Sequence, residues 1–437
     1  MGLLTDKTDP ATLQTAAGMP DIKCMNETLV FSPTEKTRLS ELAKRVAEIA
    51  ALPVQEKKAR LWMKHNDLKT QEPLIFIDPE NGWNECIPAD TLMCIAPMAR
   101  VWEMFLLKQI YWFEKLKDDK VIEPFFDVPL SYSDTGWGLE LKKAGGTHGG
   151  SYKVIQAIRD YDKDLPKVHY PKILIDHEES ERVMDLAHEV LGDILTVRQK
   201  TSWWWTLGMT WDFINLRGLE DFMLDMIEYP EDVHKLMSLL CDGVLDKLDF
   251  LQTSGYLSSN ADGTYIGSGG FGYTEDLPGP GTKSVVTTMD MWGFVESQET
   301  VAVSPGMYGE FVYPYHKKIA KRFGLNCYGC CESYNMRWEY VKELPGLRRV
   351  SVSPWADLSS LRDLLGIKYV ASIKPNPAHL AIKTMDEDVV RSEIRNAVSC
   401  AKDCVVEILM KDNNTLGKNP LNASRWVEIA REEISGA

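Results

Sequence analysis

The sequence predicts an α/β protein, a (β/α)8 barrel with a helical N-terminal cap. Along residues 121–437, short apolar runs alternate with amphipathic helical segments, the pattern of parallel strands joined by crossover helices. Residues 1–120 show mainly helical periodicity. The chain has 437 residues, 44% of them hydrophobic, enough for a large core, and no linker-like tract divides it. We therefore assign residues 1–120 to the cap and residues 121–437 to the barrel.

The cap begins with an arm of about twenty residues that has no clear period. The stretch "SPTEKTRLSELAKRVAEIAAL" then predicts a helix, because apolar residues recur at steps of three and four and Ser32 or Thr34 can cap it. A second helix is expected over residues 89–117, with a kink or break at Pro97.

Short apolar runs bounded by turn residues give the candidate strands. They are residues 73–78, 125–132, 194–199, 255–260, 291–297, 325–332, 348–354, 368–374 and 404–409. This is one strand more than a barrel needs, so one of them is either accessory or wrong.

The composition excludes several functional classes. A net charge of −15 argues against binding to nucleic acid or to an anionic membrane, since both need basic patches. The chain shows no signal peptide and no apolar run long enough to span a bilayer. Its nine cysteines are scattered, which is typical of reduced thiols. We expect a soluble cytoplasmic protein, and a homodimer is compatible with the sequence.

The stretch "LNCYGCCES" places three cysteines at the C-terminal end of a predicted strand, where barrel enzymes carry their chemistry. A disulfide between Cys330 and Cys331 is disfavoured, because adjacent cysteines bridge only with backbone strain. Packing in the core remains the ordinary alternative. Side chains alternate along a strand, so Cys327 and Cys331 should share one face and Cys330 should point with Tyr328 to the other, unless a bulge at the strand end turns Cys330 inward.

Two carboxylates upstream could complete a metal site. Glu296 ends the preceding predicted strand in "WGFVESQET", and Glu310 opens the next helix in "SPGMYGEFVYPYH". Thirteen residues separate the two glutamates, and twenty separate Glu310 from Cys331. With Cys330 as a further thiolate, these side chains are a plausible ligand set for Zn²⁺ with one position open to substrate. Ordinary surface carboxylates are the alternative for each glutamate alone.

Other residues predict a substrate pocket at the same rim. Trp204 belongs to four tryptophans within residues 203–211, which form either an aromatic substrate wall or part of the core. The glycine-rich segment 258–281 reads as a mobile rim loop, with Asn260 and Asp262 as polar contacts to substrate or metal.

Further side chains are candidates for chemistry. His148, in the flexible "GGTHGGSY", could donate a proton, although a solvated histidine is the alternative. The candidate catalytic groups are Glu310, Asp262 and His148. The candidate substrate contacts are Trp204, Asn260 and Tyr328.

The stretch "SPGMYGEFVYPYHKKIAKRFGLNCYGCCES" resembles the uroporphyrinogen decarboxylase-like superfamily, in its zinc- and corrinoid-dependent methyltransferase branch. "LRGLEDFMLDMIEYPEDVHKLM" and "GIKYVASIKPNPAHLA" are similar to other segments of that superfamily, and the likeness covers most of residues 170–437. Demethylase methyltransferases of this branch use a Glu, Glu, His set with similar spacing, in which Cys331 would replace the histidine. The His-x-Cys pair of the coenzyme M enzymes is absent, since the matching positions are Tyr328, Gly329 and Cys330.

The resemblance implies a methyltransferase that moves a methyl group from a small methylated substrate to Co(I) of a separate corrinoid protein. The chain has no cobalamin-binding DxHxxG segment of its own, so the corrinoid would come from a partner. Ligation by oxygen-rich side chains favours an aryl methyl ether as the donor, that is, O-demethylation. A metal-dependent decarboxylase or hydrolase on the same barrel is the alternative enzyme, and a non-catalytic metal-binding protein is the third hypothesis.

Overall fold

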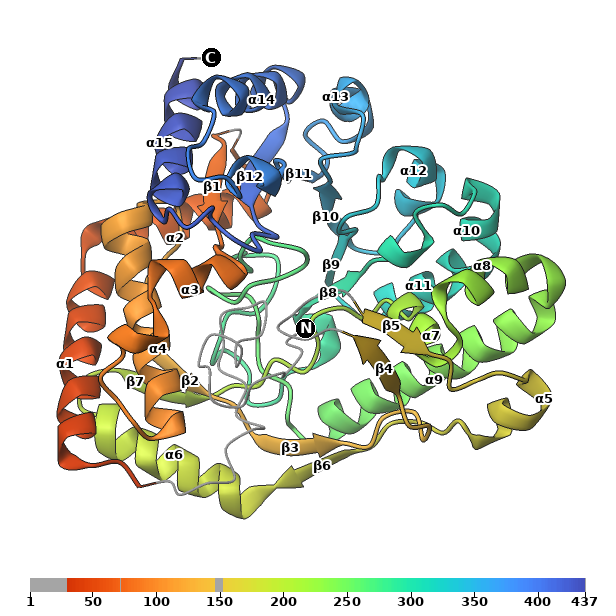
Figure 1. Ribbon diagram of the computed structural model, residues 1–437, viewed down its shortest axis with the longest axis horizontal. Coiled ribbons are helices and arrows are strands. Elements are labelled where there is room, and N and C mark those ends of the chain that lie inside the picture. Colours follow the sequence, from red (N-terminus) through yellow and green to blue (C-terminus); the bar gives the residue numbers. More distant parts are fainter. Residues whose placement is uncertain (1–29, 71, 146–151, 437) are drawn as a thin grey trace.

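The computed structural model describes residues 30–70, 72–145 and 152–436, and Figure 1 shows their course. The strands are β1 (Leu74–Ile77), β2 (Phe125–Val128), β3 (Ser131–Asp134), β4 (Lys142–Gly145), β5 (Tyr152–Ile155), β6 (Ile173–Asp176), β7 (Thr196–Gln199), β8 (Trp292–Val295), β9 (Leu325–Tyr328), β10 (Leu347–Val352), β11 (Val370–Ile373) and β12 (Val405–Met410). The α-helices are α1 (Pro33–Ala50), α2 (Pro53–Asn66), α3 (Trp83–Cys86), α4 (Pro97–Tyr111), α5 (Tyr161–Asp164), α6 (His177–Leu191), α7 (Thr210–Arg217), α8 (Leu219–Glu228), α9 (Pro230–Thr253), α10 (Pro305–Phe311), α11 (Tyr313–Ala320), α12 (Trp338–Val341), α13 (Leu361–Leu364), α14 (Glu387–Cys400) and α15 (Leu421–Ser435). Within these described ranges, no helix combines the length and the apolar character needed to cross a membrane.

A parallel sheet of six strands organises the molecule, in the order β1-β12-β11-β10-β9-β8. Two further strands, β2 and β7, form a separate parallel pair. The antiparallel pairs β3–β6 and β4–β5 lie outside these groups. The predicted α/β class with parallel strands is therefore confirmed.

The two parallel groups are not joined by strand pairing in the described part of the chain. Along β1, the Asp119 carboxylate accepts a hydrogen bond from the Ile75 amide at 2.8 Å. Along β8, the Leu207 amide donates to the Phe294 carbonyl at 2.9 Å. Each outer edge of the six-stranded sheet thus makes a hydrogen bond to an irregular segment, and among the described residues strand pairing does not close the sheet into a barrel.

The surplus strand is the one predicted over residues 255–260, which form no strand. The Asn260 side chain donates to the Trp292 carbonyl at 3.0 Å and accepts from the Trp292 amide at 2.9 Å. The Asn260 side-chain amide therefore makes hydrogen bonds to Trp292 that the backbone of a neighbouring strand would otherwise make. The prediction of a strand over residues 255–260 was wrong.

The first predicted helix is confirmed as α1. Ser32 caps it, since its Oγ accepts from the Glu35 amide at 3.3 Å while the Glu35 carboxylate accepts from the Ser32 amide at 2.8 Å. This reciprocal pair is a capping box. The helix predicted over residues 89–117 begins only at Pro97, which occupies its first turn, where a missing N–H has no cost.

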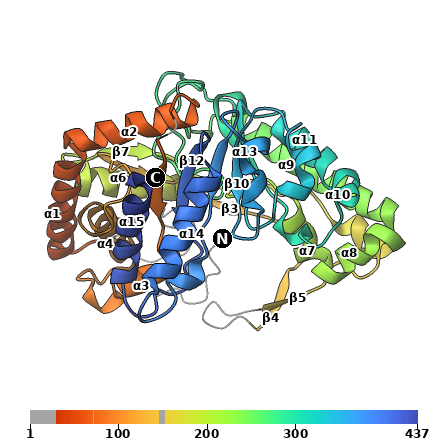
Figure 2. The same cartoon turned by 90° about the horizontal axis from the view of Figure 1, so that it is seen from above.

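Helices flank the sheet on both sides of the molecule. Figures 1 and 2 show α1, α2, α4 and α15 at one end and α7 to α11 at the other, with the six-stranded sheet between them. Helix α1 packs on α4, and α15 packs on β1. Strand β1 lies within the segment predicted as the cap and pairs with β12, so the cap and the main sheet share a strand.

The glycine-rich segment does not form a mobile rim loop, because residues 266–274 are buried. Gly267, at φ +61°, leaves only 2.9 Å between a hypothetical Cβ and Cys327 Cβ. A Cβ on Gly270, at φ +91°, would lie 2.9 Å from Glu407 Oε1. The glycines thus allow the backbone to run close against side chains of β9 and β12.

Candidate active site at the strand ends

The carboxyl ends of the parallel strands meet at one edge of the sheet, the edge at which α/β proteins bind their ligands. Strand β9 ends at Tyr328, and Gly329 follows in a left-handed conformation at φ +87°. This turn breaks the alternation of side chains. Cys330 therefore packs in the same small apolar cluster as Cys327, and the prediction that they occupy opposite faces was wrong.

Cys330 and Cys331 form a pair of neighbouring thiols, with their Sγ atoms 3.7 Å apart. Cys330 is buried and Cys331 is exposed. The hydrogen bond between the two sulfurs raises the pKa of Cys330, as burial also does, and the same bond lowers the pKa of Cys331. Cys331 is consequently the thiol that ionises first and faces solvent.

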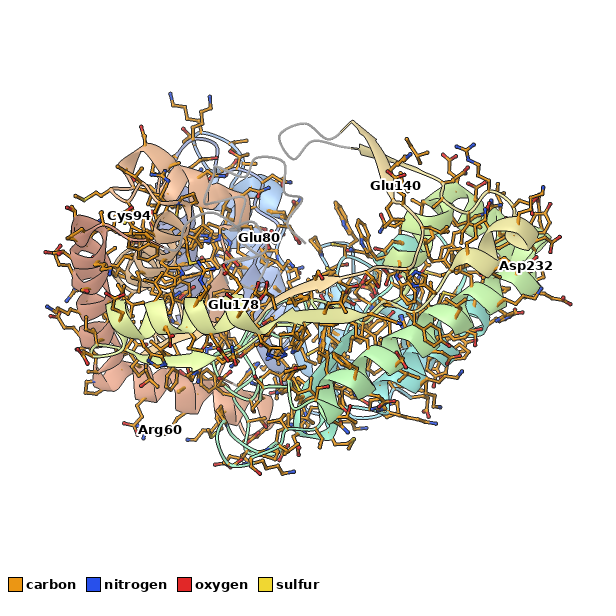
Figure 3. All side chains as sticks on the ribbon, turned by 90° about the horizontal axis from the view of Figure 1, so that it is seen from below. Arg60, Glu80, Cys94, Glu140, Glu178 and Asp232 are labelled. Carbon is orange, nitrogen blue, oxygen red and sulfur yellow. The ribbon has the colours of Figure 1, made fainter. Side chains whose placement is uncertain are left out.

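A charged group from the ends of β1 and β12 lies beside the thiol pair. Lys411 Nζ is 3.5 Å from Asp412 Oδ1 and 3.9 Å from Glu80 Oε1. Its positive charge lowers the pKa of both thiols. Burial raises the pKa of Glu80 to about 7, although the attraction of Lys411 opposes this shift. Figure 3 shows Glu80 toward the middle of the molecule.

The backbone at this charged group is unusual. Glu80 has φ +48° and Asp412 has φ +62°, a region that side chains other than glycine rarely adopt. The two residues follow β1 and β12, which pair with each other. Such strain tends to concentrate at functional sites. The sequence reasoning missed Lys411, Asp412 and Glu80. The signals that could have found them are the polar residues after the last predicted strand for Lys411 and Asp412, and those after the first predicted strand for Glu80.

Three buried carboxylates occupy the ends of β8 and β9. Glu332 accepts hydrogen bonds from the Ser297 amide and from the Cys330 amide, each at 2.9 Å. Glu296 is completely buried, and its Oε1 has no hydrogen-bond partner. Burial, reinforced by Glu299 and then by Glu332, raises the pKa of Glu296 well above its usual range. The surroundings of Glu296 therefore favour its neutral, protonated form.

The predicted zinc ligands are not all brought together. The Glu310 side chain is 61% exposed and lies 3.9 Å from the His234 imidazole of α9. The reason is helical phase, because Tyr308 and Phe311 form the buried face of α10 and turn Glu310 outward. In the described parts of the chain, no three His, Cys, Asp or Glu side chains converge to hold a metal ion. In the described residues, Glu310 therefore does not join the other predicted ligands at one metal site, and its catalytic role stays a prediction.

Asp262 is held in an ion-pair network. Its Oδ2 accepts from Lys200 Nζ at 2.6 Å and lies 3.5 Å from Arg198 Nη1. These cations outweigh the effect of burial and lower the pKa of Asp262. Asp262 is thus held by two cations in this arrangement, and its catalytic role stays a prediction.

The predicted substrate contacts have different surroundings. Asn260 is committed to the backbone of Trp292, and Tyr328 is buried, where its pKa is raised to about 12 by burial. Asn260 nonetheless lines a small pocket, and the substrate contacts of Asn260 and Tyr328 stay predictions. Trp204 does line a cavity of about 340 Å³. His148 lies outside the described residues.

No protein-family model matches the chain, and no curated protein matches it in sequence. Among solved structures, a methyltransferase from Methanosarcina mazei is similar, with a TM-score of 0.48 and 11% sequence identity over 85% of this chain and 97% of that chain.

Proposed function

We propose that the protein is a methyltransferase that moves a methyl group from a small methylated substrate to the Co(I) corrinoid of a separate protein. An aryl methyl ether is the substrate we favour. The observation that carries this proposal is the thiol pair Cys330–Cys331, which lies at the carboxyl ends of parallel strands with one thiol exposed. We also propose that the two groups of parallel strands are parts of one (β/α)8 barrel of the uroporphyrinogen decarboxylase-like type, as the sequence resemblance implies.

The thiol pair suits a thiophilic ion such as Zn²⁺ by donor type. Of the other predicted ligands, Glu310 lies on the outer face of α10 and Glu296 is sealed beside Thr206. We therefore propose Cys330 and Cys331 as the protein ligands and leave Glu310 out. When bound, the ion would act as a Lewis acid on the heteroatom that carries the methyl group.

The residues around the pair have separate tasks in this proposal. In the metal-free protein, the hydrogen bond from Cys330 and the charge of Lys411 lower the pKa of Cys331 and so favour its thiolate form. Glu332 fixes the position of Cys330 by accepting from its amide while it also accepts from Ser297. Lys411 additionally offers a buried positive charge where an anionic leaving group would form, and such preorganised charge lowers a barrier more in a buried site than in water.

A decarboxylase or hydrolase on the same fold is the second candidate. The observation that favours it is Glu80, whose pKa of about 7 suits proton transfer near neutral pH. The decarboxylase or hydrolase hypothesis predicts turnover by the isolated protein, whereas a methyltransferase needs a corrinoid partner.

The test combines metal content with methyl transfer. We expect about one zinc per chain, lost in Cys331→Ala and retained in Glu310→Ala and in Cys400→Ala, a matched control on α14. With methoxylated phenols and a reduced corrinoid protein, methyl-cobalt should form at least about a thousandfold more slowly in the zinc-free enzyme. Full zinc retention in Cys331→Ala contradicts the ligand assignment. Product formation without any corrinoid moves the protein to the second candidate.

A further inference from the structure

A cavity of about 340 Å³ lies between α9, the start of α7 and the segment that follows β3. This volume is within the range of small-molecule sites. Its principal lining side chains are Trp137, Leu139, Trp204, Leu207, Asp212 and Leu248. It shares no lining residue with the thiol pair or with its charged neighbours.

Two indole rings supply the aromatic walls of this cavity. Trp137 is buried against α9, where a Cβ on Gly243 would come within 2.5 Å of the ring. Trp204 packs edge-on against Phe323, with ring centroids 5.7 Å apart. Both rings are thus held in place by their surroundings. A fixed indole binds apolar groups, and its face also attracts cations.

The cavity also carries one uncompensated negative charge. Of its three charged lining residues, Lys247 and Asp134 pair with each other at 3.0 Å. Asp212 remains. Burial raises the pKa of Asp212 to about 6, and a hydrogen bond from Trp137 and the charge of Lys247 oppose this effect. Asp212 is therefore mainly a carboxylate at neutral pH.

A second groove adjoins the cavity. It shares Thr135 and Leu139 with the cavity and is also lined by Glu140, Asp246 and Lys172. Glu140 pairs with Lys142 at 3.0 Å, and Asp246 and Lys172 carry opposite charges, so Asp212 is the negative charge on which the choice of a cation depends. Figure 3 shows Glu140 apart from Glu80 of the thiol site.

We propose that this cavity is a binding site for a small organic cation, an amine or quaternary ammonium with an aromatic or apolar body. The body fits between Trp137 and Trp204, and the charged nitrogen meets Asp212. The inference goes beyond the proposed methyl transfer and requires neither the thiol pair nor a metal. Thr206 lines the cavity and is hydrogen-bonded to Glu296, so the occupant lies directly behind the end of β8.

Calorimetric titration with probes of one shape and different charge tests the proposal. We expect benzylamine and benzyltrimethylammonium to bind, and benzyl alcohol and benzoate to bind at least about tenfold more weakly. Asp212→Asn should weaken the two cations by about tenfold or more. Asp249→Asn is the matched control, since it makes the same charge change on α9 at a residue paired with Arg322. Equal affinity for benzylamine and benzyl alcohol would overturn the proposal.

Two further measurements keep the result independent of folding defects. Val244→Phe places a ring in the cavity without changing any charge, and it should abolish binding of both cations. In the wild-type protein, the affinity for benzyltrimethylammonium should fall as the pH is lowered through about 6, because Asp212 becomes neutral while the ligand keeps its charge. Lys247 and Asp134, the other charged groups facing Asp212, pair with each other at 3.0 Å. An affinity that is unchanged in Val244→Phe, or independent of pH, contradicts the assignment.

Discussion

The ends of β8 and β9 show how differently two neighbouring strands can finish. The strands pair in parallel, from Trp292 with Leu325 to Val295 with Tyr328. Immediately beyond β8, Glu296 is completely buried. Three residues beyond β9, Cys331 is exposed. One end is sealed and the other is open, although both occupy the same edge of the sheet.

The cause of this difference is the chain segment that covers each end. Gly208, in the tryptophan-rich segment, lies against the backbone of Glu296 so closely that a Cβ would overlap the Glu296 carbonyl oxygen. At β9, the left-handed Gly329 directs the following thiols away from the regular strand direction. A position at a strand end is therefore not sufficient for reactivity, because the covering segment decides which side chain can meet a ligand.

Gly208→Ala should have the largest effect on stability, because Gly208 belongs to the segment that packs directly over the end of β8. The added methyl group overlaps the Glu296 carbonyl oxygen, which is backbone and cannot rotate away. We expect a loss of about 3 kcal/mol in the free energy of unfolding, the upper part of the usual range for overpacking. Urea unfolding measures this loss. Gly306→Ala is the control, since a Cβ there contacts nothing within 4 Å, and it should be neutral or slightly stabilising in α10. If the two substitutions change the unfolding free energy equally, the segment at Gly208 does not pack closely over the end of β8.

Glu332→Gln should have the next largest effect, because this carboxylate connects the sealed end to the open one. It accepts hydrogen bonds from the Ser297 amide and from the Cys330 amide. In glutamine, one of the two oxygens is replaced by an NH2 group, which would face one of these backbone N–H groups and cannot accept its hydrogen bond. We expect a loss of about 2 kcal/mol in unfolding free energy, typical of hydrogen bonds to a charged group. Cys330 should also react severalfold faster with a maleimide. Glu339→Gln, at an exposed glutamate of α12, should change neither quantity. Unchanged Cys330 reactivity in Glu332→Gln would show that the carboxylate does not fix the thiol pair.

Local patterns account for what could be predicted from the sequence. The capping box at Ser32 and the apolar period of α1 depend on residues within one or two turns. The buried strands of the main sheet are apolar runs such as "CVVEIL", which β12 confirms. The thiol cluster was also placed correctly at the end of β9, because the strand and the motif are adjacent in sequence.

Contacts between distant segments account for what could not be predicted. The glycines of residues 266–274 indicated mobility, yet they permit close packing against β9 and β12. Glu310 had suitable spacing for a metal ligand, but the phase of α10 relative to α9 turns it outward. Lys411 and Glu80 lie more than three hundred residues apart in the chain and meet because β1 pairs with β12. None of these arrangements can be derived from spacing along the chain.

The last prediction concerns the pH dependence of the sealed end. The pKa of Glu296 is raised in the folded protein by burial and by Glu299 and Glu332, whereas an unfolded glutamate titrates at about 4.3. Above that pH the unfolded chain releases its proton while the folded protein keeps it. The folded state then binds more protons, so the stability contributed by this group falls as the pH rises.

Glu296→Gln removes this dependence, because glutamine resembles the neutral acid and cannot ionise. Relative to the wild type, the variant should therefore gain stability between pH 5 and pH 8, on the order of 1 kcal/mol for one nearly isosteric change at a buried polar group. Urea unfolding at both pH values measures the difference. The exposed Glu310→Gln serves as the control and should show no such change with pH. If Glu296→Gln gains nothing at pH 8 relative to pH 5, Glu296 is ionised in the folded protein. The end of β8 would then be open to water or cations like the end of β9, and the contrast between the two strand ends would not hold.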